Sequence, residues 1–151
     1  MASLIAWDDS RVLRLADTDR DDAEMIDEFE RIDLVAHAGA PVPGVHGIDA
    51  AQGRIGIIED RVDGPSMLVV LSARPWQARR LGRELGELHR RILRLDPPAA
   101  LPGDGPAICH GRLGPECVFL TAQGPLVTNW RMAHRGHAAD DIAITTALLD
   151  T

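Results

Sequence analysis

The stretch that decides the fold reads CHGRLGPECVFL at residues 109–120, and VTNW follows it at residues 127–130. Residues 118–121 and 126–128 are mostly apolar and predict the two strands of a hairpin that turns at residues 122–124. The loop in front of this hairpin carries a histidine, an arginine and two cysteines. Side chains of these types build binding and catalytic sites, so this loop is the first candidate for function.

Residues on both sides of this loop predict a mixture of helices and strands. Carboxylates at residues 19–22 offer N-caps for one helix, and GAPVPG at residues 39–44 ends it. Leucine and isoleucine recur every three or four positions between residues 81 and 95, which is typical of one buried helix face. The full set expected is a strand at 12–15, a helix to about 38, strands at 45–48 and 55–58, helices at 67–71 and 75–95, the hairpin, and a helix at 138–149.

The composition is that of a folded domain. At 151 residues, with 45% apolar and 26% charged residues, the chain is long enough for one domain with a small core. No apolar run reaches the roughly 18 residues that a membrane-spanning helix needs. The first residues, MASLIAWDD, lack the pattern of a signal peptide. We therefore expect a cytoplasmic protein without membrane insertion.

Acidic residues are concentrated near the start of the chain. The formal net charge is −7, and residues 1–33 account for it with eleven acids and four arginines. A nucleic-acid backbone requires a basic protein surface, so this balance argues against a nucleic-acid partner. The simplest interpretation of the acidic segment is a solvated helix face.

Several motifs together resemble the aminoglycoside phosphotransferase family, whose members are relatives of the protein kinases. The loop and hairpin are similar to the family's His-Gly-Asp, Gly-Asn-Val-Leu and Ile-Asp-Trp segments. The other matching segments are GAPVP at 39–43, IIE at 57–59 with VDGPSM at 62–67, LGELH at 85–89, and GHAADDIA at 136–143. The resemblance covers nearly all of residues 11–150.

By this resemblance, the three residues that carry the family's chemistry are replaced. Arg112 stands at the place of the catalytic Asp, Cys117 at that of the metal-binding Asn, and Asn129 at that of the metal-binding Asp. Two other positions are better kept. Arg14 takes the place of the strand residue that reaches the phosphates, and Glu28 that of the helix glutamate that braces it.

The resemblance implies an α+β fold of the reduced protein-kinase-like type, in one domain. Residues 1–60 would form a remnant N-lobe and residues 61–151 a reduced C-lobe. Only ten residues precede Arg11, so we expect the strand pair and the Gly-rich loop that cover ATP to be missing. Thirteen residues separate Leu95 from Cys109, where relatives insert the helices of the acceptor pocket. We therefore expect an incomplete N-lobe and a shortened C-lobe.

The candidate residues for binding a nucleotide or an anion are Arg14, Glu28, Glu59 and Arg112. Glu59 ends the segment that in relatives contacts adenine through backbone groups. Two interpretations of Arg112 stay open: it binds an anion, or it forms an ion pair with Asp141, which in relatives anchors this loop. We expect His110 to brace the same loop by hydrogen bonding.

The residues at the replaced positions are poor at phosphoryl transfer. Arg112 does not accept a proton at working pH, and the Cys117 sulfur is a soft ligand that suits Mg²⁺ badly. The spacing of His134, His137 and Asp140 suggests a metal site, but Gly136 interrupts any helix that would align them. We expect no metal site and no cofactor, with ATP binding without Mg²⁺ left possible.

These inferences predict a catalytically inactive phosphotransferase-like protein. It would act as a binding, scaffold or accessory subunit with a protein partner or a second copy of itself, since a shortened fold should expose apolar surface near residues 68–71 or 147–149. The alternative is a residual ATP-dependent small-molecule phosphotransferase, or a metal-independent module that binds a nucleotide or an anion.

Overall fold

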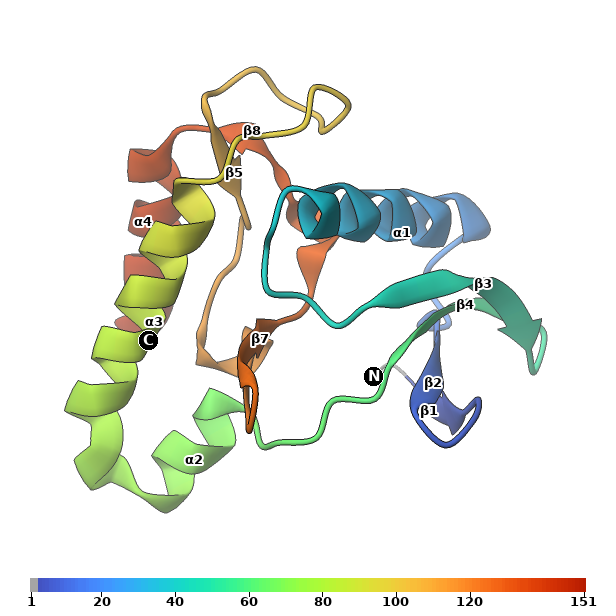
Figure 1. The fold of residues 1–151 in the computed structure, drawn as a ribbon, viewed down its shortest axis with the longest axis horizontal. Coiled ribbons are helices and arrows are strands. Elements are labelled where there is room, and N and C mark those ends of the chain that lie inside the picture. Colours follow the sequence, from blue (N-terminus) through green and yellow to red (C-terminus); the bar gives the residue numbers. More distant parts are fainter. Residues whose placement is uncertain (1–2) are drawn as a thin grey trace.

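The computed structural model describes residues 3–151, which fold into a sheet with one helix packed against it and a second, more helical part beside them (Figure 1). The antiparallel sheet has the strand order β1-β2-β4-β3. Its elements are β1 (Ser3–Ala6), β2 (Arg11–Leu15), α1 (Asp22–His37), β3 (Val45–Ala51) and β4 (Arg54–Asp60). The second part contains α2 (Met67–Ala73), α3 (Ala78–Leu93), β5 (Ala107–Cys109), β6 (Val118–Thr121), β7 (Gly124–Val127), β8 (His134–Gly136) and α4 (Ala138–Leu149).

Helix α1 begins where the acidic run predicts. Asp21 is the N-cap and accepts a hydrogen bond from the backbone of Glu24, whose side chain accepts one in return from the backbone of Asp21. This reciprocal capping box satisfies two backbone donors that the first turn leaves without partners. The helix ends at His37, just before the glycine and proline run, as expected.

The sheet has two different faces because its side chains alternate along each strand. Leu13, Leu15 and Ile58 form a small buried cluster on one face. On the other face, the register places Val12 opposite Glu59 and Arg14 opposite Ile57. This second face is the one that α1 covers, and it carries the polar candidates named from the sequence.

The expectation that the strand pair ahead of residues 11 and 12 is missing is wrong for one strand. β1 pairs antiparallel with β2 over its whole length, from Ser3 opposite Leu15 to Ala6 opposite Val12. Asp8 closes the turn, since its carboxylate accepts hydrogen bonds from the backbones of Ser10 and Arg11 at 2.8 Å each. Leucine and isoleucine at positions 4 and 5 were too short a signal to identify this strand in advance.

The predicted long helix is present as α3 behind a short 3-10 turn at Pro75–Gln77. Its buried residues are Leu81, Leu85, Leu88, His89 and Ile92. The leucines and the isoleucine form the apolar stripe that the sequence predicts and pack into the main core, together with Met25, Ile32 and Trp130. His89 adds a buried polar group to this face.

Strands β5 and β8 form a two-stranded sheet that the sequence does not indicate, because each has three residues. Cys109 lies opposite His134, and Ala107 lies opposite Gly136. A Cβ atom added to Gly105 would lie 2.2 Å from the backbone of Gly136, so glycine is required for this close approach. The pairing fixes the start of the polar loop that follows β5.

The helices and strands make this a mixed α+β protein. Among residues 3–151, none of the helices combines the length and the apolar character that crossing a membrane requires.

Candidate functional site

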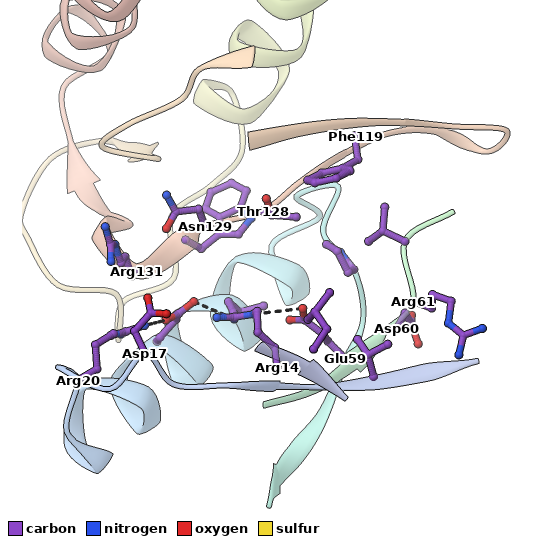
Figure 2. A pocket seen from close by; sticks show the side chains of 17 residues that line it. Arg14, Asp17, Arg20, Glu59, Asp60, Arg61, Phe119, Thr128, Asn129 and Arg131 are labelled. Atoms are coloured by element: carbon purple, nitrogen blue, oxygen red, sulfur yellow. Dashed lines mark hydrogen bonds and ion pairs between the residues drawn. The ribbon is translucent and has the colours of Figure 1, made fainter. Parts of the chain in front are cut away.

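A cleft of about 410 Å³ lies between the α1-covered face of the sheet and the segment that follows β7 (Figure 2). Its apolar walls come from both parts of the molecule and include Leu4, Val12, Ile32, Pro43, Val62 and Phe119. This volume is in the range of small-molecule sites. Of the polar candidates, Arg14, Glu28, Glu59 and Asn129 line the cleft, while Arg112 is not among its lining residues.

Arg14 lies between two carboxylates at the centre of the cleft (Figure 2). Its Nη2 donates to Glu28 Oε1 at 2.8 Å, and its Nε donates to Glu59 Oε1 at 3.2 Å. Burial favours the neutral form of Arg14, but the charges of Glu59 and Glu28 outweigh it and raise the pKa of the guanidinium. Burial raises the pKa of Glu59, and the charge of Arg14 offsets this only in part.

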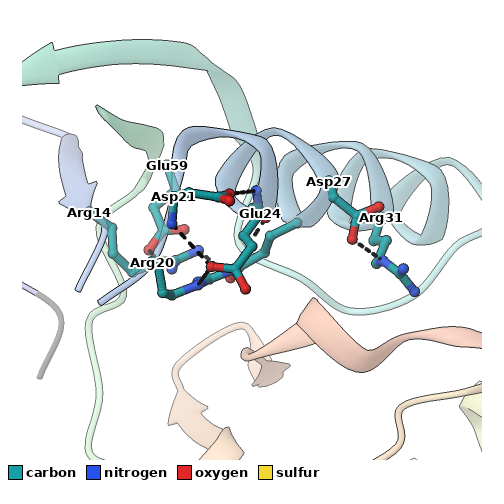
Figure 3. Close-up of polar contacts among 8 residues, drawn as sticks. Arg14, Arg20, Asp21, Glu24, Asp27, Arg31 and Glu59 are labelled. Atoms are coloured by element: carbon teal, nitrogen blue, oxygen red, sulfur yellow. Dashed lines mark hydrogen bonds and ion pairs between the residues drawn. The ribbon is translucent and has the colours of Figure 1, made fainter. Parts of the chain in front are cut away.

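A second arginine completes this ion cluster. Arg20 lies just ahead of α1 and donates through Nη1 to Glu28 Oε2, while its Nη2 donates to the backbone carbonyl of Glu24 (Figure 3). The Glu28 side chain is only 2% exposed, and each of its two oxygens has an arginine partner. A carboxylate buried this deeply needs such partners, because an unpaired buried charge is costly.

His110 is the first residue of the loop after β5 and is completely buried. Its Nδ1 accepts from the backbone nitrogen of Arg112 at 3.3 Å, so Nε2 carries the proton and donates to the Thr128 carbonyl at 2.9 Å. The ring also packs edge-to-face on Trp130, with centroids 4.8 Å apart. His110 therefore ties the loop to the end of β7.

Asp141 holds the same loop from the first turn of α4. Its Oδ1 accepts from the backbone nitrogen of Gly111 at 2.8 Å, and its Oδ2 accepts from that of His110 at 3.1 Å. Oδ2 also accepts from His89 Nε2 of α3 at 2.8 Å. Burial works against the charged form, but these hydrogen bonds prevail and lower the pKa of Asp141.

The possible ion pair between Arg112 and Asp141 does not form. Both Asp141 oxygens are occupied by His89 and the loop backbone, and the Arg112 side chain is exposed. Among residues 3–151, no ion pair involves Arg112. The loop is therefore anchored through its backbone, which leaves the Arg112 guanidinium in contact with solvent.

Cys117 and Asn129, which stand at two of the replaced positions, lie next to each other. Asn129 Nδ2 donates to Cys117 Sγ at 4.0 Å, and Sγ donates to the Arg112 carbonyl at 3.6 Å. Burial raises the pKa of the Cys117 thiol, so it stays protonated at neutral pH. Asn129 has φ 63° and ψ 55°, a left-handed conformation that asparagine tolerates well.

His134, His137 and Asp140 are evenly spaced in the sequence, but the fold does not bring their side chains together. His134 belongs to β8, whereas Asp140 lies in the first turn of α4. Within residues 3–151, no three histidine, cysteine or acidic side chains converge in a way that could hold a metal ion.

The model of the phosphotransferase enzyme family matches this chain over residues 3–151. Because the match covers nearly the whole chain, the protein belongs to that family. A search of curated proteins finds no match.

Sequence reasoning missed two residues of this site. Arg20 was not named, although it lies eight positions ahead of Glu28 and pairs with it. His89 was noted only as part of the LGELH motif, and its bond to Asp141 spans 52 positions. The available signal was a polar residue on the apolar face of α3, since a buried histidine requires a hydrogen-bond partner.

The burial of His110 predicts an acid-sensitive fold. Burial lowers the pKa of His110 below its ordinary value of 6.5, so the folded state binds fewer protons there than the unfolded state. Its stabilising contribution is complete above about pH 6.5 and is lost as the pH falls below that value. His110→Gln keeps a donor for the Thr128 carbonyl but does not titrate. Urea denaturation from pH 7 to pH 5 should therefore show a smaller loss of unfolding free energy in this variant than in the wild type; equal losses would contradict the assignment.

Proposed function

We propose that this member of the phosphotransferase family does not transfer phosphate and acts as a binding or accessory subunit of a protein complex. The observation that carries the proposal is the set of side chains at the three catalytic positions. An exposed arginine stands at the place of the base, and a buried thiol in contact with an amide stands at the place of the metal ligands.

Arg112 is unsuited to the role of a base. A guanidinium remains protonated at every working pH and has no acceptor atom, so it takes no proton from a substrate hydroxyl. Phosphoryl transfer depends on orienting the nucleophile and on neutralising charge with metal ions. At position 112, therefore, no side chain can orient the nucleophile.

The donor atoms of Cys117 and Asn129 suit Mg²⁺ poorly. Mg²⁺ prefers oxygen ligands in octahedral geometry, and carboxylates hold it best. Cys117 offers a protonated sulfur, and the Asn129 amide directs its nitrogen to that sulfur. Nucleotide binding at this cleft would therefore gain little from Mg²⁺.

Exposed apolar side chains supply the argument for a partner. On α4, the face with Asp141 and Thr145 is buried, while Ile142, Ile144 and Leu149 are 39–52% exposed. Two further apolar side chains are exposed, Val69 on α2 at 59% and Trp76 in the short turn before α3 at 76%. Of these residues, Ile142 and Leu149 lie two turns apart on one face of α4, and apolar exposure along one face is typical of interaction sites.

One observation favours the alternative of residual activity. The pair of Arg14 and Glu28 is intact, and it lies in a cleft of suitable size. An arginine that binds phosphate and is held in place by a glutamate is one part of a phosphate-transfer site. It supplies neither the base nor the metal ligands.

Restoring the family's residues at positions 112, 117 and 129 tests whether their replacement removed Mg²⁺ binding and phosphate transfer. We expect wild-type ATP turnover equal to the protein-free blank, and an ATP affinity that changes less than about twofold when Mg²⁺ is added. The triple variant Arg112→Asp, Cys117→Asn, Asn129→Asp should gain at least about tenfold in affinity with Mg²⁺, because carboxylates attract the ion. Titration calorimetry measures both, with Arg79→Asp on the exposed face of α3 as a control. Mg²⁺-dependent turnover by the wild type would overturn the proposal.

A substitution on the exposed surface of α4 tests whether this surface binds a partner protein. Ile142→Asp places a charge on the exposed face and should reduce recovery of the native complex about tenfold or more, as expected when a central apolar contact is lost. Ile26→Asp on the acidic exposed side of α1 is the matched control and should have little effect. Affinity capture from native cells followed by mass measurement gives the readout. A wild-type protein recovered only as monomer would contradict the partner.

A further inference from the structure

The charges that line the cleft balance one another. Four arginines lie along it, at positions 14, 20, 61 and 131, and four carboxylates lie among them, at positions 17, 28, 59 and 60. Their formal charges sum to zero. A site that takes several phosphates normally presents an excess of positive charge, so this balance is unusual for a nucleotide cleft.

The innermost charges are also engaged with one another. Arg14 bonds both Glu28 and Glu59, and Arg20 bonds the second oxygen of Glu28. Glu59 lies in the middle of the sheet, opposite Val12, and its carboxylate points to Arg14 on the same face (Figure 2). A phosphate group that approached Arg14 would meet two carboxylates at the same guanidinium, and like charges in a partly buried site repel strongly.

The rest of the cleft offers apolar surface. Leu4 and Val12 of the sheet line the cleft, and Phe119 of β6 lies across it from Arg14 (Figure 2). Phe119 presents a flat ring, which suits contact with another flat ring. Trp130 also lines the cleft and is 1% exposed.

We propose that the cleft binds an uncharged, planar aromatic small molecule and discriminates against phosphate-bearing ligands. This inference rests on the proposed function, because a site that has lost phosphoryl transfer has no need to hold the phosphates. Glu59 is the residue that sets the preference, since it occupies the side of Arg14 that Glu28 leaves open. The apolar walls supply the affinity.

Adenosine and ATP are suitable probes, because they share one ring system and differ in charge. The chain has three tryptophans, of which Trp7 and Trp76 are exposed and Trp130 lines the cleft. A Trp7→Phe, Trp76→Phe background therefore reports fluorescence from the cleft alone. In the absence of Mg²⁺, adenosine should change Trp130 emission and bind at least about tenfold more tightly than ATP.

Two variants in this background assign the preference to residues. Glu59→Gln keeps a hydrogen-bonding partner for Arg14 but removes one negative charge. This variant should raise the affinity for ATP about tenfold and change the affinity for adenosine by less than about twofold. Phe119→Ala should weaken adenosine binding at least about fivefold, whereas Ile26→Ala on the exposed side of α1 should leave adenosine binding unchanged.

Three results would overturn this inference: ATP binding as tightly as adenosine, no fluorescence response to either probe, or no gain in ATP affinity in Glu59→Gln. They are distinguishable from failure of the proposed function. Tight ATP binding without phosphate transfer contradicts only the ligand class, whereas phosphate transfer contradicts the loss of catalysis itself.

Discussion

The carboxylate of Asp141 is the interaction on which the rest of the site depends. From the first turn of α4, it accepts hydrogen bonds from two successive backbone nitrogens of the loop after β5 and from His89 of α3. One buried charge thus joins two helices and a loop. It is stable there because every bond it accepts favours its ionised form, whereas removal of a partner would leave the charge uncompensated.

Because the loop is anchored through its backbone, its conformation is independent of the side chain at position 112. Asp141 and His110 hold the backbone, and neither depends on the side chain at position 112. The side chain at position 112 can therefore change without loss of the loop. The same separation holds across the cleft, where Arg14 and Glu28 keep their places while Glu59 and Arg20 neutralise them. We infer that the protein keeps the frame of a phosphotransferase around a cleft of different character.

Much of the fold was predictable because its signals are local. The capping carboxylate of α1, the apolar stripe of α3 and the hairpin turn at Gln52 and Gly53 are each determined within a few residues, and both turn residues have the positive φ that such a turn requires. Strand β1 was not predicted because Leu4 and Ile5 alone are too short an apolar signal. Strands β5 and β8 were not predicted because each has three residues and pairs with a partner far away in the sequence.

Only part of the candidate site's membership, and few of its contacts, could be predicted from the sequence. Resemblance to the family identified Arg14, Glu28 and Asp141 by position. It did not reveal that Asp141 bonds His89 in place of Arg112, or that Glu59 bonds Arg14 across 45 positions. Such contacts depend on how the two parts of the molecule pack, which no local pattern encodes.

Amide hydrogen exchange tests the central claim, that Asp141 holds the loop through its backbone, most directly. The backbone nitrogens of His110 and Gly111 should exchange slowly in the wild type and at least about tenfold faster in Asp141→Asn, which removes one acceptor and the charge. The nitrogen of Thr128, which donates to the Cys117 carbonyl at 2.9 Å, should change little. Unchanged protection of His110 and Gly111 in the variant would contradict the account.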